Sequence, residues 1–252
     1  MANTTAFSGN IKFNKRFINQ SIPALGWKND LDPITEWIDN SISTNGNASS
    51  IWIDINNIKD RLYDLKVQDN GNGVLHDHML ESFATFGTDT TITNSTYNDY
   101  DINNFGSGGS ASLVVTALAS HTKMSKVISI TEDDNGQRWK SVLIFDFNLD
   151  EPVKLYDKVK TTKPTGVTIE VKSLELKSKP THWAKELAVI YFPNKFRNDN
   201  FTITIKKNGQ EKQVKFEDPF YRDLSNHELN KYIHQDTKTI YLDYNGAPVE
   251  ID

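Results

Sequence analysis

A carboxylate and an amide stand four residues apart near the start of the chain, at Glu36 and Asn40. If residues 34–42 form a helix, the two side chains lie on one face, about one turn apart. Asn40 can offer a neutral oxygen to Mg²⁺, a hard ion that prefers oxygen ligands and keeps several waters. Glu36 can accept a proton from a water that attacks a phosphoryl group. The pair favours phosphoryl chemistry, although the same spacing also fits an ordinary solvated helix face.

The helix that must position this pair is predicted from its apolar residues. Ile34, Ile38 and Ile42 recur every four residues, which places them on a neighbouring stripe that can pack on a core. The pair Asp32-Pro33 suits the N-cap and the first helical position. We expect the helix to end in the polar loop at 43–47.

A second candidate motif, Asp69-Asn70-Gly71-Asn72-Gly73-Val74, follows two predicted strands at 51–55 and 62–68. Glycines at a strand end let the backbone turn sharply and come close to a ligand. The Asp69 carboxylate could accept a hydrogen bond from the exocyclic amine of an adenine. An ordinary Asn/Gly-rich turn is the alternative. A calcium loop fits poorly, because the glutamate expected near its end is missing.

A third motif is a glycine-rich turn, Gly106-Ser107-Gly108-Gly109-Ser110, that precedes an apolar helix at 113–118. Such a turn offers free N–H groups and a positive dipole end to phosphates. The polar segment 87–105 before it is long enough to be a lid or a binding loop. A flexible linker is the alternative. In the preceding helix, predicted at 76–86, His76 and His78 point to different sides, which argues against a metal site.

The remaining patterns complete an α/β chain. Strands are predicted at 127–131 and 141–147, joined by a hairpin turn, and at 165–171 and 239–244. A helix is predicted at 181–191 with Trp183, Leu187 and Ile190 on its apolar side. An Asn208-Gly209 turn predicts a hairpin between strands at 201–205 and 214–216.

Composition limits the class of protein. A chain of 252 residues with 37% hydrophobic residues suits one large domain, or one domain with a subdomain. The net charge of −5 shows no basic stripe, so DNA binding is possible but is not signalled. The sequence has no cysteine, no signal-peptide pattern and no apolar run long enough to span a bilayer. We expect a soluble, cytoplasmic protein without a membrane partner, and an N-terminal arm at 1–30 that is disordered or exchanged between protomers.

Together and in this order, the motifs resemble the Bergerat ATP-binding fold of the GHKL superfamily, which comprises gyrase B subunits, the heat-shock chaperones of ninety kilodaltons, histidine kinases and MutL. The resemblance implies an α/β (α+β) two-layer sandwich: a mixed, mostly antiparallel sheet with helices on one face and an ATP lid. It implies an ATP-binding domain at 31–215. Residues 216–252 would extend this domain or begin a following transducer-like domain.

The resemblance also assigns roles to residues. Glu36 would be the general base, Asn40 would bind Mg²⁺ and the nucleotide, and Asp69 would hold the adenine amine. A phosphate-facing hydroxyl is expected just after Gly166, but Val167 occupies that position, so the hydroxyl would come from Thr168 or Thr165 or would be absent. The other ATP-binding residues implied are Gly71, Gly73, Val74, Gly106, Ser107, Gly108, Gly109 and Ser110.

Within the superfamily, the chain looks most similar to the microrchidia and MutL branch. The segments 82–87 (Ser-Phe-Ala-Thr-Phe-Gly) and 105–108 (Phe-Gly-Ser-Gly) resemble microrchidia ATPases. Residues 166–171 are similar to the MutL strand that begins Gly-Thr-Thr-Val. The chain departs from this pattern at Ser110, where microrchidia proteins carry a lysine.

The resemblance implies Mg²⁺-dependent ATP hydrolysis, slow on its own, that drives a nucleotide-gated conformational change or homodimerisation through the arm. A downstream domain or a partner protein would supply a lysine for the γ-phosphate. Val167 and the missing lysine favour an alternative, a nucleotide-sensing interaction module with little turnover. A histidine-kinase-like phosphotransferase is disfavoured, because Glu36 would activate water and the sequence shows no dimerisation helix that bears an acceptor histidine.

Overall fold

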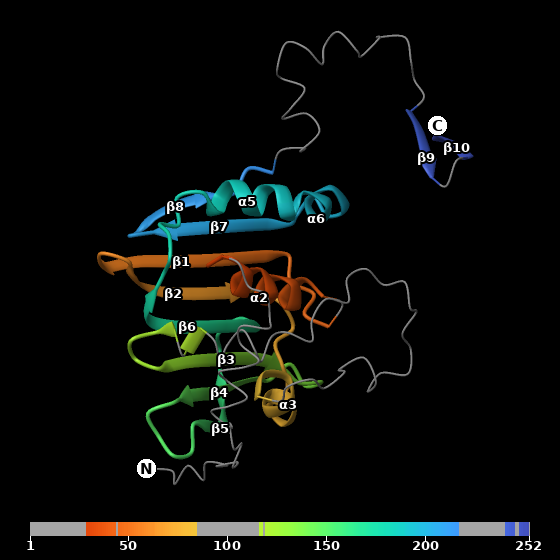
Figure 1. Ribbon diagram of the computed structural model, residues 1–252. Helices are drawn as coiled ribbons and strands as arrows, with labels where there is room; N and C mark the ends of the chain where they lie inside the picture. Colours follow the sequence, from red (N-terminus) through yellow and green to blue (C-terminus); the bar gives the residue numbers. More distant parts are fainter. Residues whose placement is uncertain are drawn as a thin grey trace.

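An eight-stranded sheet forms the centre of the molecule (Figure 1). The computed structural model describes residues 29–43, 45–84, 116–117, 119–216, 240–244 and 247–251. The strand order is β5-β4-β3-β6-β2-β1-β7-β8, and among these neighbours β1 and β7 run parallel while the other pairs are antiparallel. The strands are β1 Ser50–Lys59, β2 Leu62–Asp69, β3 Met124–Glu132, β4 Arg138–Asp146, β5 Val153–Thr161, β6 Gly166–Glu175, β7 Thr202–Lys207 and β8 Gln210–Gln213.

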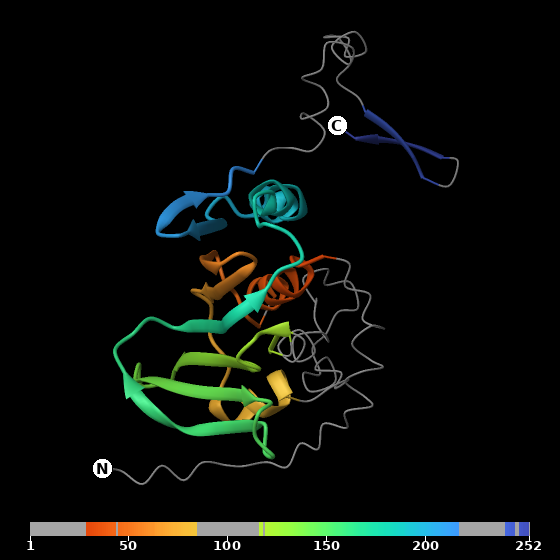
Figure 2. The same cartoon turned by 60° about the vertical axis from the view of Figure 1, so that its left-hand side comes forward.

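Helices cover one face of this sheet, as the turned view shows (Figure 2). They are α2 Asp32–Ile42, α3 Met79–Ala84, α5 Trp183–Ile190 and α6 Phe192–Arg197, and a short 3-10 turn at His76–His78 precedes α3. The mixed, mostly antiparallel sheet with one helical layer confirms the predicted fold class. No helix in the described part of the chain is long and apolar enough to cross a membrane.

The core lies between the sheet and α2. Ile34 and Ile38 of α2 are fully buried, and Ile42 packs against the same cluster, as their spacing predicts. Across the sheet, Ile53 of β1 lies opposite Val67 of β2, which lies opposite Ile169 of β6. These three side chains are buried on the helical side, and the alternation of β1 predicted this inward row.

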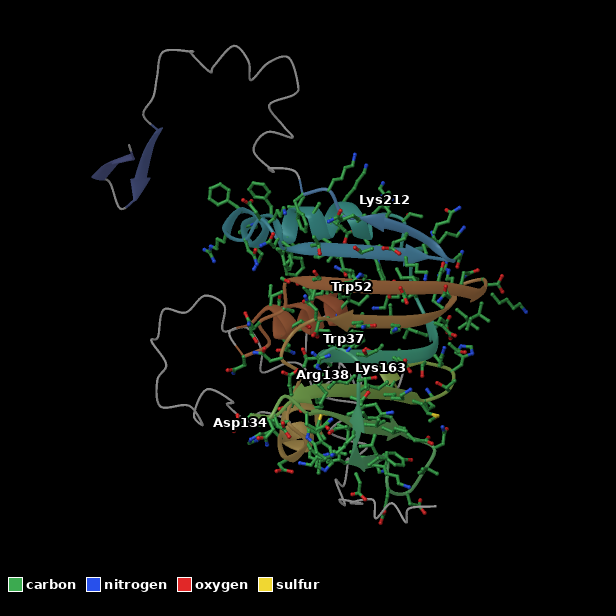
Figure 3. All side chains as sticks on the ribbon, turned by 180° about the vertical axis from the view of Figure 1, so that it is seen from behind. Trp37, Trp52, Asp134, Arg138, Lys163 and Lys212 are labelled. Carbon is green, nitrogen blue, oxygen red and sulfur yellow. The ribbon has the colours of Figure 1, made fainter. Side chains whose placement is uncertain are left out.

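Residues one position away point to the other face of the sheet, because side chains alternate along a strand. The row on that face runs from Trp52 of β1 through Gln68 of β2 to Thr168 of β6. Figure 3 shows this face, with Trp52 labelled on its strand; 37% of Trp52 is exposed.

Several predicted boundaries are wrong. Asp32 is the first residue of α2 and not its N-cap, and the Asn29 side-chain oxygen accepts the N–H groups of Leu31 (2.7 Å) and Asp32 (3.1 Å). The strand predicted at 214–216 is instead β8, which begins directly after the turn. Asn208 and Gly209 both have positive φ, which is the geometry of a tight two-residue hairpin.

The helix predicted at 181–191 is shorter than expected, and one residue predicted on its buried side is exposed. It ends at Ile190, whose side chain is 49% exposed, whereas Trp183 and Leu187 are buried as expected. Tyr191, the residue after the helix, takes the buried position instead. The strand predicted at 239–244 is β9 (Ile240–Tyr244), which pairs antiparallel with β10 (Ala247–Ile251) in a sheet of two strands.

Candidate functional site

Asp69, the last residue of β2, is the centre of a buried hydrogen-bond cluster. Asp69 is buried, with 5% of its surface exposed. Its Oδ1 accepts the backbone N–H groups of Gly71 (2.8 Å) and Val167 (3.0 Å), and its Oδ2 accepts the hydroxyl of Ser41 (2.8 Å). An ionised carboxylate has about four acceptor positions. The described residues therefore leave Oδ2 with room to accept one more donor.

Burial and hydrogen bonding act in opposite directions on Asp69. Burial raises the pKa of this carboxyl above its ordinary value, and the three hydrogen bonds lower it by less. The donors are what allow a buried aspartate to be held in one orientation. The cluster thus fixes an acceptor at the end of β2.

Glycines let three backbone segments meet around Asp69. A Cβ atom on Gly71 would stand 2.2 Å from the carbonyl oxygen of Gly46, and one on Gly166 would stand 2.2 Å from that of Asp69. Gly73 has φ +75°, and a Cβ atom there would stand 2.3 Å from the carbonyl oxygen of Ile130. The close approach that the sequence predicted is therefore, in the first place, an approach to neighbouring backbone.

Side chains hold the loop after β2 in place. The Val74 N–H donates to the hydroxyl of Ser129 (2.6 Å), which in turn donates to the Val74 carbonyl oxygen (2.8 Å). The Asn70 side-chain oxygen accepts the N–H groups of Ser49 and Ser50. The loop is thereby attached to β3 on one side and to the start of β1 on the other.

Ser41 connects this cluster to α2. Its hydroxyl lies 2.8 Å from Asp69 Oδ2 and 2.9 Å from the carbonyl oxygen of Trp37, one turn earlier in the helix. Asn40 is the preceding residue, and Glu36 lies one turn before it. The structure thus brings the helix with the predicted base and metal ligand to the predicted adenine acceptor.

Glu36 and Asn40 differ from Asp69 in that both side chains are half-buried. In the described segments, no hydrogen bond or ion pair engages the Glu36 carboxylate or the Asn40 amide. Burial is the main cause that raises the pKa of Glu36, followed by the negative charges of Asp39 and Asp32. A half-buried carboxylate with raised basicity is suited to accept a proton.

A contact that sequence reasoning missed lies on the same helix. The Tyr191 hydroxyl is 2.8 Å from Asp39 Oδ1 and 3.1 Å from the carbonyl oxygen of Thr35. Burial raises the pKa of Asp39, and the tyrosine hydrogen bond opposes this. Burial and the charge of Asp39 raise the pKa of Tyr191 far above its ordinary value, so its hydroxyl keeps its proton and donates. The sequence placed Tyr191 at a helix end but gave no sign of a partner 152 positions away.

Other predicted site residues do not join the cluster. Thr168 pairs with Gln68 and Ile128 on the sheet face opposite to Asp69, so its hydroxyl points away from the cluster. Val167 occupies the side facing the helices, where its side chain packs on the core. The turn at 106–110, the predicted lid at 87–105 and the arm up to residue 28 lie outside the described residues.

The donor set suits a magnesium ion held together with phosphates. Among the described residues, no group of three or more His, Cys, Asp or Glu side chains gathers as a metal cage. Mg²⁺ in nucleotide sites is commonly held by one or two protein oxygens, the phosphates and water. The Asn40 amide oxygen fits this use.

Comparison with known proteins identifies the family. A family model described as histidine kinase-, DNA gyrase B-, and HSP90-like ATPase matches residues 32–169. The 43K ATPase domain of Thermus thermophilus gyrase B, solved in complex with an aminocoumarin, is similar with a TM-score of 0.53 and 15% identity over 84% of this chain and 55% of that chain. The N-terminal domain of a DNA repair protein reaches a TM-score of 0.47 and 16% identity over 78% of this chain and 55% of that chain. No curated protein sequence matches.

These likenesses carry different weight. At 15% identity, the gyrase B domain supports the fold alone, and this chain spans only 55% of that structure's length. The matched family segment covers more than half of the 252 residues and contains Glu36, Asn40, Asp69 and Val167. The chain therefore belongs to the family of histidine kinase-, DNA gyrase B- and HSP90-like ATPases.

Proposed function

We propose that this domain binds ATP together with Mg²⁺ and hydrolyses it at a site formed by α2, the loop after β2 and the start of β6. The observation that carries the proposal is the Asp69 cluster. It holds a buried acceptor with one open position, and it is joined through Ser41 to the helix that bears Glu36 and Asn40. Membership of an ATPase family supports the same reaction.

Asp69 would recognise the adenine base. Its open Oδ2 position would accept the exocyclic amine of adenine, while the backbone of Gly71, Gly73 and Val74 would line the base. A guanine presents an oxygen at the corresponding ring position, and two acceptors facing each other in a buried site are unfavourable. The proposal therefore includes a preference for ATP over GTP.

Asn40 and Glu36 would serve the phosphates. Asn40 would hold Mg²⁺, which when bound would neutralise phosphate charge and polarise the γ-phosphoryl group. The Glu36 carboxylate would orient the attacking water and accept its proton. Burial, and then the charges of Asp39 and Asp32, raise the pKa of Glu36, which makes it a stronger base than an ordinary glutamate.

Finer features are also proposed. By family analogy, ATP would drive closure of the lid and formation of a homodimer through the arm at 1–30, and a lysine from a downstream domain or a partner would complete the site. We also propose that the chain is of the microrchidia and MutL type. The turn at 106–110 would bind phosphates. Thr168 is not included, because its side chain lies on the opposite face.

One observation favours a second function, a nucleotide sensor with little turnover. At the start of β6, Val167 offers Asp69 only its backbone N–H and an apolar side chain, where a family hydroxyl was expected. Such a site would bind the adenine base of ATP well and still hydrolyse ATP slowly.

The test compares phosphate release from Mg-ATP with calorimetric binding of a non-hydrolysable ATP analogue, in the wild type and in Glu36→Ala. Loss of a general base typically costs about 10²–10⁴-fold. We expect both proteins to bind the analogue and only the wild type to release phosphate. Binding without release in either protein would favour the sensor, and absence of binding in both would refute the nucleotide site.

A further inference from the structure

Tyr191 contacts the helix that carries the proposed base, although it lies between α5 and α6. Its hydroxyl reaches Asp39 Oδ1 (2.8 Å) and the carbonyl oxygen of Thr35 (3.1 Å). These two residues are one turn apart on α2 and enclose Glu36 in the sequence. A single hydroxyl from another element thus contacts the turn of α2 that presents Glu36.

The ring of Tyr191 is held by its surroundings. The residue is 2% exposed. Its ring centroid lies 6.3 Å from that of Phe201, which lies 5.6 Å from that of Phe216. Because rotamers of buried, packed rings are restricted, the hydroxyl has a defined position relative to the sheet.

Among the described residues, two further contacts hold α2, one before the Tyr191 contact and one after it. Before the helix, the Asp30 carboxylate accepts the N–H groups of Lys177 (3.1 Å) and Ser178 (2.9 Å). Near its end, Ser41 donates to Asp69. The outer contacts fix where the helix begins and ends, whereas the Tyr191 contact acts on the turn that contains Glu36.

We propose that Tyr191 is a positioning residue, which through its hydrogen bond to Asp39 fixes the rotation of α2 and hence the place of Glu36 against the attacking water. The inference rests on the proposed ATPase function and names a residue for the same site. Catalysis is sensitive to such placement, since a shift of about 1 Å can cost about 10²-fold in rate. A role limited to stability would predict a different result, because it would leave turnover of the folded protein unchanged.

Tyr191→Phe removes the hydroxyl and keeps the packed ring. We expect kcat for phosphate release to fall by about 10-fold or more, with KM for Mg-ATP and the Kd of the non-hydrolysable analogue within about 2-fold. Affinity should hold because Asp69, the proposed acceptor for the adenine base, shares no hydrogen bond with Tyr191. Tyr156→Phe, on β5, is the matched control and should retain wild-type kcat. Unchanged kcat in folded Tyr191→Phe would overturn the inference, and so would equal losses in kcat and in affinity.

A double-mutant cycle tests whether Tyr191 acts through Asp39. If Asp39 is the effective partner, Tyr191→Phe should have little further effect on kcat in an Asp39→Ala background, since the hydrogen bond to Asp39 is already absent. Independent, multiplicative effects would overturn the proposed route. The two ways to fail can be told apart. If the wild type hydrolyses ATP and Tyr191→Phe has the same kcat, only this inference is wrong. If the wild type does not hydrolyse ATP, the proposed function and this inference are both wrong.

Discussion

The loop after β2 and the helix α2 meet at the site, but they use their polar groups in opposite ways. Around Asp69, nearly every acceptor position is occupied by a donor from the chain itself, and backbone segments touch where glycines allow it. On α2, Glu36 and Asn40 have no such partners in the described part of the chain. The loop after β2 is held in a fixed conformation and leaves a single acceptor position open. Helix α2 keeps the side chains of Glu36 and Asn40 free to react. Substitutions in the loop should therefore lower the free energy of unfolding, and substitutions of Glu36 or Asn40 on α2 should lower the rate of ATP hydrolysis.

Gly73→Ala should show the largest loss of stability. The added Cβ would meet the Ile130 carbonyl oxygen at 2.3 Å in a backbone with φ +75°. We expect about 3 kcal/mol or more of destabilisation, measured by urea unfolding. Gly136→Ala is the matched control, because φ is +74° there and no heavy atom lies within 4 Å of the added atom. Its cost should be only about 1 kcal/mol. Equal losses in the two variants would show that backbone conformation, and not contact, dominates.

Ser41→Ala should have an intermediate effect, because it removes the donor that joins α2 to Asp69. Hydrogen bonds to charged groups contribute about 1.5–3 kcal/mol. We expect unfolding free energy to fall by about 2 kcal/mol, together with weaker binding of the ATP analogue as α2 loses its attachment. Normal binding in a destabilised variant would mean that the Ser41 contact serves only the fold.

Asn40→Ala should barely change stability, since its amide makes no hydrogen bond to the described residues. We expect a change within about 0.5 kcal/mol. Phosphate release should be lost across a Mg²⁺ titration, or recovered only at much higher Mg²⁺. Ser43→Ala is a nearby control that should keep the wild-type Mg²⁺ dependence, because the Ser43 hydroxyl hydrogen-bonds backbone groups of Asn40 and Gly46. A fully active Asn40→Ala would remove the metal assignment.

The smallest expected effect is in the pH profile of kcat. Because burial and then Asp39 and Asp32 raise the Glu36 pKa, the base is protonated at a higher pH than an ordinary glutamate. The rate should therefore fall as pH decreases through a value above the ordinary glutamate range. Asp32→Asn removes one negative charge, so it should move this acid limb slightly to lower pH. A shift to higher pH would contradict the electrostatic explanation.

Local patterns predicted much of this arrangement. Period-four isoleucines gave the buried face of α2, alternation gave the inward row of β1, and the glycine pattern located the turn that follows Asp69. The features that the sequence did not predict are contacts between residues far apart in the chain. Neither Ser41 with Asp69 nor Tyr191 with Asp39 has a local signal. The assignment of Thr168 fails for a related reason, because a shift of one residue in a strand moves a side chain to the opposite face.

Strand β5 escaped prediction because it is an edge strand. Only Val153 and Leu155 of its side chains are buried, and lysines and other polar residues occupy most of its other positions. Charged residues on an edge strand discourage pairing with other chains, but they also erase the apolar alternation by which a strand is predicted. Helix α6 has only six residues, which is too short for a helical period to be detected from the sequence.

The most direct test of the nucleotide site is calorimetric binding of a non-hydrolysable ATP analogue with Mg²⁺ to the wild type and to Asp69→Asn. The amide can keep the accepted bonds from Gly71 and Val167, but it replaces the open acceptor with a donor. The unfolding midpoints of both proteins are measured first, because the amide nitrogen would stand where Oδ2 accepts the Ser41 hydroxyl, and its loss lowers stability. We predict binding by the wild type and at least about 10-fold weaker binding by a fully folded Asp69→Asn, a loss of about 1.4 kcal/mol or more. Equal affinity in the two folded proteins, or no binding by the wild type, would contradict the assignment.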